Sequence, residues 1–289
     1  MRHGRLPGQA GRGMKIAIAS GKGGTGKTTI AVSLALAADG PVHYADCDVE
    51  EPNGHILLKP VLDQRREFAL AVPEVVETQC SGCGECRDIC RFNAITVFGS
   101  MAMAFTELCH SCGGCFLVCP ENALTRGKRV LGLLENGRAG TIGFSQGTLR
   151  VGEAMAAPLI SAVKEDAVLK DGLVILDAPP GTSCPLLAAI TGADYTLLVS
   201  EETPFGLHDL RLAVGVLRKL EQPFGVIINK ADLGDGKTGE WCREENIPVH
   251  LEVPFDRKIA EGYAAGIPLV DCRPELLPFF SSLLKELSR

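Results

Sequence analysis

The sequence predicts an α/β fold with a mostly parallel, doubly wound sheet that is interrupted by one cysteine-built module. Two observations predict the sheet: strand-like apolar runs alternate with helix-like stretches, and a glycine-rich loop joins the first strand to the first helix. Such alternation implies right-handed crossovers between parallel strands, with helices covering both faces. The distribution of cysteine predicts the module, because eight of the 12 cysteines lie between Cys80 and Cys119.

Length and composition agree with a folded chain of about two domains. Of its 289 residues, 46% are apolar and 22% are charged, which allows a sizeable core. The net charge of −6 argues against a general nucleic-acid binder, because such a protein needs a basic face. No apolar run approaches the ~20 residues that span a bilayer, and residues 1–13 lack the apolar run of a secretory signal. We therefore expect a cytoplasmic protein without a membrane span, beginning with a disordered extension over 1–13.

The expected elements divide the chain into a host domain and an insertion. Strands are expected at residues 14–19, 42–45, 140–144, 173–177, 195–199, 224–228 and 248–253. Helices are expected at 28–38, 148–164, 185–190, 207–220, 238–245 and 276–287. The last helix has one apolar face and balanced charges, which favours packing on the sheet over binding to lipid. The host domain then comprises 14–76 and 128–289, and the insertion comprises 77–127.

The clustered cysteines form an internal duplication. The spacing CxxCxxCxxxC runs from Cys80 to Cys90 and again from Cys109 to Cys119, with every member displaced by 29 positions. Three thiolates at this spacing can surround one iron–sulfur cubane on a tight loop. Disulfides and zinc are the alternatives; a cytoplasmic location disfavours the first, and zinc ordinarily uses two separated CxxC pairs.

This spacing resembles that of two-cluster bacterial ferredoxins over roughly Thr78 to Arg126. In that family each cluster takes its fourth ligand from the other run. The resemblance implies a small α+β domain with two [4Fe–4S] clusters, one held by Cys80, Cys83, Cys86 and Cys119 and the other by Cys109, Cys112, Cys115 and Cys90. Pro120 follows the last cysteine of the second run as the family expects, whereas Arg91 stands in its place in the first, which bears on local geometry and not on ligation.

A phosphate-binding loop is expected between the first strand and the first helix. The pattern GxxxxGK[ST] is met there, and its backbone N–H groups cradle phosphates at a helix N-terminus. The chemistry of the pattern assigns Lys27 to the β- and γ-phosphates and Thr28 to Mg²⁺. The candidate nucleotide-binding residues of the loop are Gly21, Gly23, Gly24, Thr25, Gly26, Lys27, Thr28 and Thr29.

The additional lysine at position 22 gives the loop the form KGGTGKT. This resembles the deviant Walker A loop of the MinD, Mrp and nitrogenase iron-protein family, which belongs to the SIMIBI class of P-loop NTPases. The resemblance implies a homodimer, or a dimer with a paralogue, that sandwiches the nucleotide. It also implies that Lys22 reaches the nucleotide of the partner; the alternative is a solvated loop lysine.

Two aspartate-bearing segments agree with the same family. Asp46-Cys47-Asp48 resembles switch I, in which Asp48 would orient the attacking water or act near Mg²⁺. Asp177 begins the segment DAPPGT, which resembles the Walker B and switch II segment of Mrp-type members. The resemblance implies that Asp177 holds Mg²⁺ through water and that Gly181 senses the γ-phosphate. An aspartate at a strand end can instead cap a helix.

The segment for base recognition has two interpretations. Residues 229–232 match the NKxD pattern that reads guanine in GTPases. The ATPase family instead uses an asparagine at this strand end to contact adenine, and the loop 253–256 lies along the base. We favour ATP on the family resemblance, with Asn229 and Pro254 as the base contacts.

Together these features resemble the MinD-superfamily P-loop ATPases that contain an inserted ferredoxin domain. We expect Mg-ATP hydrolysis in a dimer to gate electron transfer through two clusters to an unidentified redox or metallocofactor protein, by analogy with the nitrogenase iron protein. The alternative is an iron–sulfur or metallocofactor carrier of the Mrp type. Those carriers generally use a C-terminal CPxC pair, whereas this chain has only lone Cys242 and Cys272 after Cys184. A positioning ATPase that acts on membranes or DNA is a third, less favoured class.

Overall fold

A computed structural model describes residues 13–288, and the expected extension lies outside the described residues except at its last position. There the expectation is wrong, because Gly13 is buried and its N–H donates to the Leu169 carbonyl at 3.0 Å. The described chain forms two compact units. One comprises residues up to Arg66 and from Leu133 onward, and the other comprises Glu67–Gly132.

A nine-stranded sheet has the order β11-β10-β9-β1-β8-β2-β7-β6-β3. Its parallel members are β11 (Val249–Val253), β10 (Phe224–Asn229), β9 (Tyr195–Glu201), β1 (Met14–Ala19), β8 (Leu173–Asp177), β2 (Val42–Asp46) and β7 (Ile142–Leu149). The predicted mostly parallel α/β fold is thereby confirmed. Since the carboxyl ends of these strands lie along one edge, the loops that follow them are brought together there.

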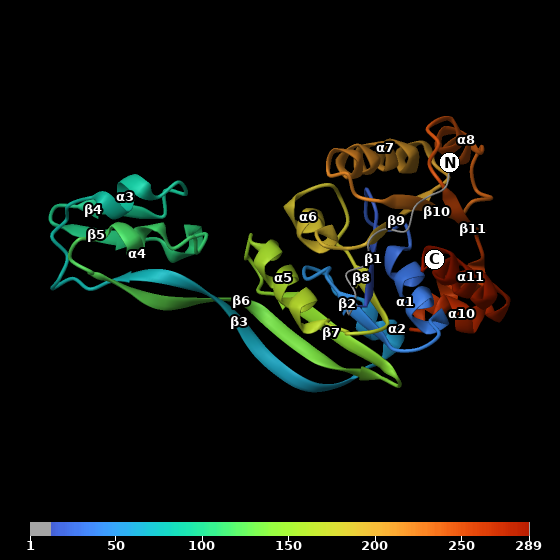
Figure 1. Ribbon diagram of the computed structural model, residues 1–289, viewed down its shortest axis with the longest axis horizontal. Coiled ribbons are helices and arrows are strands. Elements are labelled where there is room, and N and C mark those ends of the chain that lie inside the picture. The colour runs from blue at the N-terminus through green and yellow to red at the C-terminus, as the bar shows by residue number, and fades with distance from the viewer. Residues whose placement is uncertain (1–12, 289) are drawn as a thin grey trace. The chain divides into compact units, whose positions relative to one another are not determined.

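Helices cover both faces of this sheet (Figure 1). The six predicted helices occur as α1 (Lys27–Ala37), α5 (Ala156–Asp166), α6 (Cys184–Ile190), α7 (Pro204–Lys219), α8 (Lys237–Glu244) and α11 (Leu277–Leu287). Helix α11 buries Phe280 and Leu283 in the same core cluster as Ile30 of α1, as its apolar face predicted. The expectation for 148–164 is wrong at its start, because β7 continues to Leu149 and a loop follows. None of the helices within 13–288 is long and apolar enough to cross a membrane.

Two long strands were not expected from the sequence. β3 (Val61–Val75) and β6 (Leu124–Ala139) lie at the β7 side of the sheet, and each contributes residues to both compact units. A two-residue turn at 140–141 joins β6 to β7. The first half of β3 is polar and exposed, so it carries none of the apolar signal of the buried strands.

The cysteine-rich unit consists of two short helices and a hairpin. Helix α3 (Glu85–Ile89) and helix α4 (Gly114–Val118) occupy equivalent places in the two cysteine runs, and β4 (Ile95–Phe98) pairs with β5 (Met101–Ala104). The unit extends beyond the expected 77–127 because β3 and β6 lead into it. Where they do so, the Val76 N–H donates to the Ala123 carbonyl at 2.8 Å.

Three short helices of the host domain were also missed. They are α2 (Gly54–Leu58), α9 (Arg257–Ala264) and α10 (Leu269–Cys272). Helix α9 had a recognisable start, since the Asp256 carboxylate accepts the Lys258 N–H at 2.7 Å as an N-cap. Helix α9 matters because it lines the cavity described below.

Candidate functional site

A cavity of about 360 Å³ opens at the start of α1, between the glycine loop and the ends of neighbouring strands. Gly26 has φ +88 immediately before the helix, a conformation that side chains rarely adopt. Gly21 is equally constrained, because a Cβ there would lie 2.3 Å from the Asp209 carbonyl oxygen. Of the residues predicted to bind nucleotide or Mg²⁺, those on the cavity wall are Gly23, Gly24, Gly26, Lys27, Thr28, Thr29, Asp48, Asn229 and Pro254.

Lys27 is the buried cation at the floor of this site. Its Nζ lies 2.9 Å from Asp177 Oδ1 and 3.8 Å from Asp48 Oδ2. Burial lowers the pKa of Lys27, but the charges of the two carboxylates outweigh burial, and the net effect raises its pKa. The Tyr44 hydroxyl donates to the other oxygen of Asp177 at 2.7 Å. The structure therefore brings together the lysine and both switch aspartates predicted from the sequence.

The two aspartates of the first switch segment have different environments. Asp46 is fully buried and its Oδ2 accepts the N–H groups of Asn53 and Gly54 at 3.1 and 2.8 Å. Burial, followed by the charge of Asp177, raises the pKa of Asp46 to about 8. Asp48 lines the cavity, and burial raises its pKa to about 6 against the opposing charge of Lys27. Asp46 thus holds the start of α2, and Asp48 is the aspartate that faces a ligand.

The second switch segment contacts the residue before the glycine loop. The Gly181 N–H donates to the Ser20 carbonyl at 3.0 Å, and Gly181 has φ +93. Pro180, rather than Gly181, lines the cavity. The expected γ-phosphate sensor is therefore joined to the loop in this structure but does not form part of the cavity wall.

The side chains of the NKxD segment are already engaged within the protein. The Asn229 amide donates to the Thr25 carbonyl at 2.8 Å, and Asp232 Oδ1 accepts the Phe255 N–H at 2.5 Å. Asp232 thus holds the loop that contains Pro254 through one of its two carboxylate oxygens. The sequence also missed the wall contributed by α9, which includes Ile259 and Tyr263.

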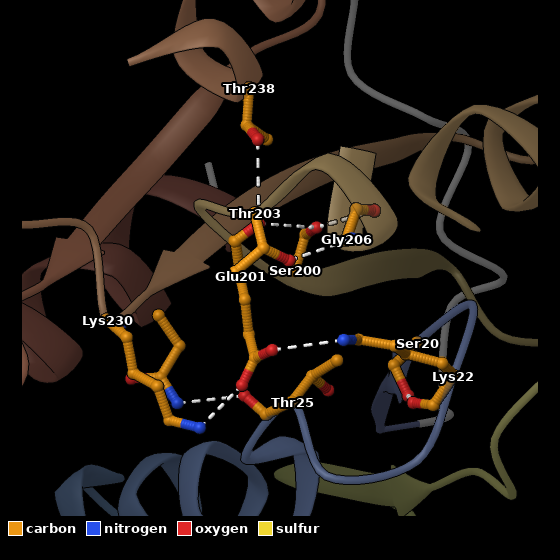
Figure 2. A network of polar contacts seen from close by, with 10 residues as sticks. Ser20, Lys22, Thr25, Ser200, Glu201, Thr203, Gly206, Lys230 and Thr238 are labelled. Atoms are coloured by element: carbon orange, nitrogen blue, oxygen red, sulfur yellow. Dashed lines mark hydrogen bonds and ion pairs between the residues drawn. The ribbon is translucent and has the colours of Figure 1, made fainter. Parts of the chain in front are cut away.

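Lys22 pairs with an acid of its own chain (Figure 2). Its Nζ lies 3.1 Å from Glu201 Oε2, and Glu201 also accepts a hydrogen bond from Lys230 Nζ at 2.5 Å. Glu201 was not predicted from the sequence, because nothing in the motif links the end of β9 to the glycine loop. Nearby, the buried hydroxyl of Thr25 lacks a partner among the residues described, and Thr25 does not line the cavity.

The eight clustered thiols line two separate cavities. One is bordered by Cys80, Cys83, Cys86 and Cys119, and the other by Cys90, Cys109, Cys112 and Cys115. Each set takes three cysteines from one run and the fourth from the other run. Among residues 13–288, no three histidine, cysteine or acidic side chains converge on a point suited to a single metal ion. Four thiols bordering one cavity are the number of ligands that a [4Fe–4S] cluster takes.

Backbone N–H groups donate to the sulfur atoms at repeat-related positions. The Ala94 N–H donates to Cys90 and the Ala123 N–H donates to Cys119, both at 3.3 Å. Both cysteines also have nearly the same backbone angles, so Arg91 in place of a proline leaves the local geometry unchanged. Burial first, and neighbouring thiols second, raise the pKa of Cys115 to about 11. Bound iron would compensate for this cost of ionising the thiols.

Comparisons with known proteins agree with this geometry. The family model described as the CobQ/CobB/MinD/ParA nucleotide binding domain matches residues 16–269. An uncharacterized protein of Methanocaldococcus jannaschii is 32% identical over 281 residues, which cover 95% of this chain and 96% of that one. An iron-sulfur cluster carrier protein of Pyrococcus horikoshii is 25% identical over 278 residues, which cover 89% and 79% of the two chains.

Solved structures support the fold alone. The cell division ATPase MinD of Pyrococcus furiosus superimposes with a TM-score of 0.56 at 18% identity, covering 95% of this chain and 99% of that one. The septum site-determining protein MinD of Pyrococcus horikoshii, complexed with Mg-ADP, gives a TM-score of 0.54 at 20% identity, covering 96% of each chain.

Proposed function

Because the chain belongs to the CobQ/CobB/MinD/ParA nucleotide-binding family, we propose that it is an Mg-ATP-hydrolysing dimer in which nucleotide gates electron transfer through two [4Fe–4S] clusters to a partner protein. The observation that carries the proposal is the division of eight thiols into two crossed sets of four. In each set, three cysteines come from one run and the fourth comes from the other run. A module of this kind supplies one-electron transfer and requires a partner, and the nucleotide site supplies a change of state.

The charge arrangement at the phosphate loop supports Mg-ATP as the ligand. Lys27 Nζ lies 2.9 Å from Asp177 Oδ1, so each group neutralises the other. Phosphates would attract Lys27, and Mg²⁺ would take its place beside Asp177 with the Thr28 hydroxyl. Asp48 then remains at the cavity wall to orient the attacking water. Adenine is the expected base on the family resemblance, and the hydrogen bond from the Phe255 N–H to one oxygen of Asp232 gives that acid a structural role in the loop.

The two crossed cysteine sets would hold the clusters, with Cys119 and Cys90 as the exchanged ligands. The N–H groups that donate to these sulfurs stabilise negative charge, and therefore favour the reduced state of an adjacent cluster. Cys83 and Cys112 are the exposed thiol of each set. They mark the side of each cavity at which electrons could enter or leave.

Contacts around the first switch segment offer a route for nucleotide-dependent movement. The Leu149 N–H at the end of β7 donates to the carbonyl of Val49, which directly follows Asp48, at 2.8 Å. Gly147 packs so closely there that a Cβ would lie 2.8 Å from Val49. β7 is joined by its turn to β6, the strand that returns from the cysteine-rich unit. A shift of Asp48 on ATP binding would therefore act directly on β7.

Stopped-flow oxidation of the dithionite-reduced, anaerobically purified protein by a small acceptor protein tests this function. We expect the rate to differ at least severalfold between ATP and ADP. A Lys27→Ala variant, which lacks the phosphate-binding lysine, should lose that difference but keep its iron. Equal rates with ATP, ADP and no nucleotide would refute gating.

Cluster delivery is the second candidate, favoured by the relatives named as iron-sulfur cluster carrier proteins. A shared cluster needs accessible thiolates from both protomers. After the switch-adjacent Cys184, the chain offers only Cys242, which is fully buried, and Cys272. Stoichiometric transfer of a cluster to an apo-protein, with loss of iron from this protein, would establish delivery in place of electron transfer.

A further inference from the structure

A second charged cluster lies beside the phosphate loop, apart from the Lys27–Asp177 pair (Figure 2). Glu201 stands at the carboxyl end of β9 and its side chain is only 11% exposed. One of its oxygens is 3.1 Å from Lys22, and the other accepts from Lys230 at 2.5 Å. Lys230 is the lysine of the NKxD segment, for which base recognition has provided no role.

The Glu201 carboxylate therefore forms ion pairs with two ammonium groups. Burial raises the pKa of Glu201, but its hydrogen bonds to Lys230 and Lys22 outweigh burial, so that its pKa is lowered and it stays ionised at neutral pH. A buried carboxylate is costly when it has no cation. Because two cations are present, Glu201 still has one ion-pair partner when either lysine moves away.

The two lysines differ in how firmly they are held. Lys230 has φ +54 and its N–H donates to the Asn229 side chain at 3.0 Å, which fixes the residue at the end of β10. Lys22 belongs to the glycine loop and makes the longer contact with Glu201. Because its contact with Glu201 is the longer of the two, Lys22 is the cation more readily released, and Lys230 is the one that remains.

We propose that Glu201 and Lys230 are positioning residues for Lys22: Glu201 retains Lys22 on its own chain, and Lys230 lowers the cost of releasing it to a nucleotide held by a second copy. This inference rests on the proposed ATP-dependent dimer. It gives the two positioning residues opposite effects, although they form an ion pair with each other. If the ion pair were only a structural contact, both substitutions would change the dimer dissociation constant in the same direction.

Glu201→Gln removes the charge that retains Lys22, so dimers should form at lower protein concentration. Lys230→Met leaves Glu201 dependent on Lys22 alone, so dimers should require higher concentration. A net hydrogen bond to a charged group corresponds to about tenfold in an equilibrium constant, and a symmetric dimer contains two copies. We expect changes of about 10- to 100-fold in the dimer dissociation constant, in opposite directions.

Sedimentation velocity of the anaerobic holoprotein at saturating ATP measures that constant, with Glu244→Gln and Lys219→Met on exposed positions as matched controls. In the double variant Glu201→Gln/Lys230→Met, the effect of Lys230→Met should disappear, because no buried carboxylate remains to be stranded. Thermal unfolding checks that each variant is folded. Should Glu201→Gln fail to fold, Glu201→Asp, which keeps the charge but shortens the reach to Lys22, replaces it and should also favour the dimer.

The outcomes distinguish failure of the proposed dimer from failure of the role of Glu201 and Lys230. A wild-type protein that forms no ATP-dependent dimer overturns both the dimer and this inference. A wild-type dimer with both single variants shifted in the same direction, or neither shifted, overturns the role of Glu201 and Lys230 alone and leaves the ATPase proposal standing.

Discussion

The crossed arrangement of the cysteines gives a prediction that tests the module directly. Cys80 and Cys119 border the same cavity although they belong to different runs, whereas Cys80 and Cys90 belong to one run and border different cavities. Pairs of serine substitutions can therefore damage one cavity or both while changing the same number of thiols. Serine preserves the size of the side chain but is a poor ligand for cluster iron.

The structure fixes the size of the expected effect. Cys80→Ser/Cys119→Ser should remove one cluster and leave the other, so the iron content should fall from about eight to about four atoms per chain. Cys80→Ser/Cys90→Ser takes one ligand from each cavity and should lower iron toward zero, or convert both clusters to species with fewer iron atoms.

Iron and acid-labile sulfide analysis of anaerobically purified protein gives the count. EPR of the reduced protein adds an independent signature, because only a chain with two reduced clusters shows spin–spin coupling. If the same-run pair kept half of its iron and the cross-run pair lost all of it, each run would hold its own cluster and the crossed arrangement would be refuted.

Three further outcomes follow from the host domain. Asp177→Asn should reduce ATP hydrolysis by at least about 100-fold, measured as phosphate release, because both the Mg²⁺ contact and the partner of the loop lysine are weakened; unchanged turnover would exclude Asp177 from the site. Asp232→Ala should lower the free energy of unfolding by about 1 kcal/mol through the lost contact to the 253–256 loop, yet leave ATP preferred over GTP in competition binding. A selective loss of GTP binding in this variant would show that Asp232 reads the base. Finally, burial raises the pKa of Asp46 to about 8 and that of Asp48 to about 6, so the folded chain binds more protons than the unfolded chain. The free energy of unfolding, measured without nucleotide, should therefore fall as pH rises from about 4 to about 8. Asp46→Asn should flatten most of that slope in urea unfolding at several pH values, and a slope equal to that of the wild type would contradict this assignment.

The strongest sequence predictions came from local patterns with one physical solution. A buried parallel strand, a glycine loop and a helix form one continuous unit, so β1, the loop and α1 could be placed almost to the residue. Central strands such as β8 were equally predictable, because both of their faces are buried and apolar. The exposed half of β3 lacked that pattern and was missed, and with it the true extent of the cysteine-rich unit.

The candidate site divides in the same way. Lys27, Asp48 and Asp177 were named from motifs, and the fold brings them together because the strands that precede them end at one edge of the sheet. Glu201 was not predictable, since a single acid at the end of a strand has no pattern of its own. Only the pairing of β9 beside β1 places it against the glycine loop.

The sequence by itself determined the chemistry available to this protein: two runs of thiols, a phosphate loop and the acids of its switch segments. These follow from residue type and spacing along a few turns of chain. The tertiary structure decided which groups are free to use that chemistry. It divided the eight thiols between two cavities, committed Asp232 and Asp46 to backbone N–H groups, and gave Lys22 a partner 179 positions away. Hydrogen bonds and charges act over a few ångströms, and residues so distant in sequence come within that range only when the sheet is complete.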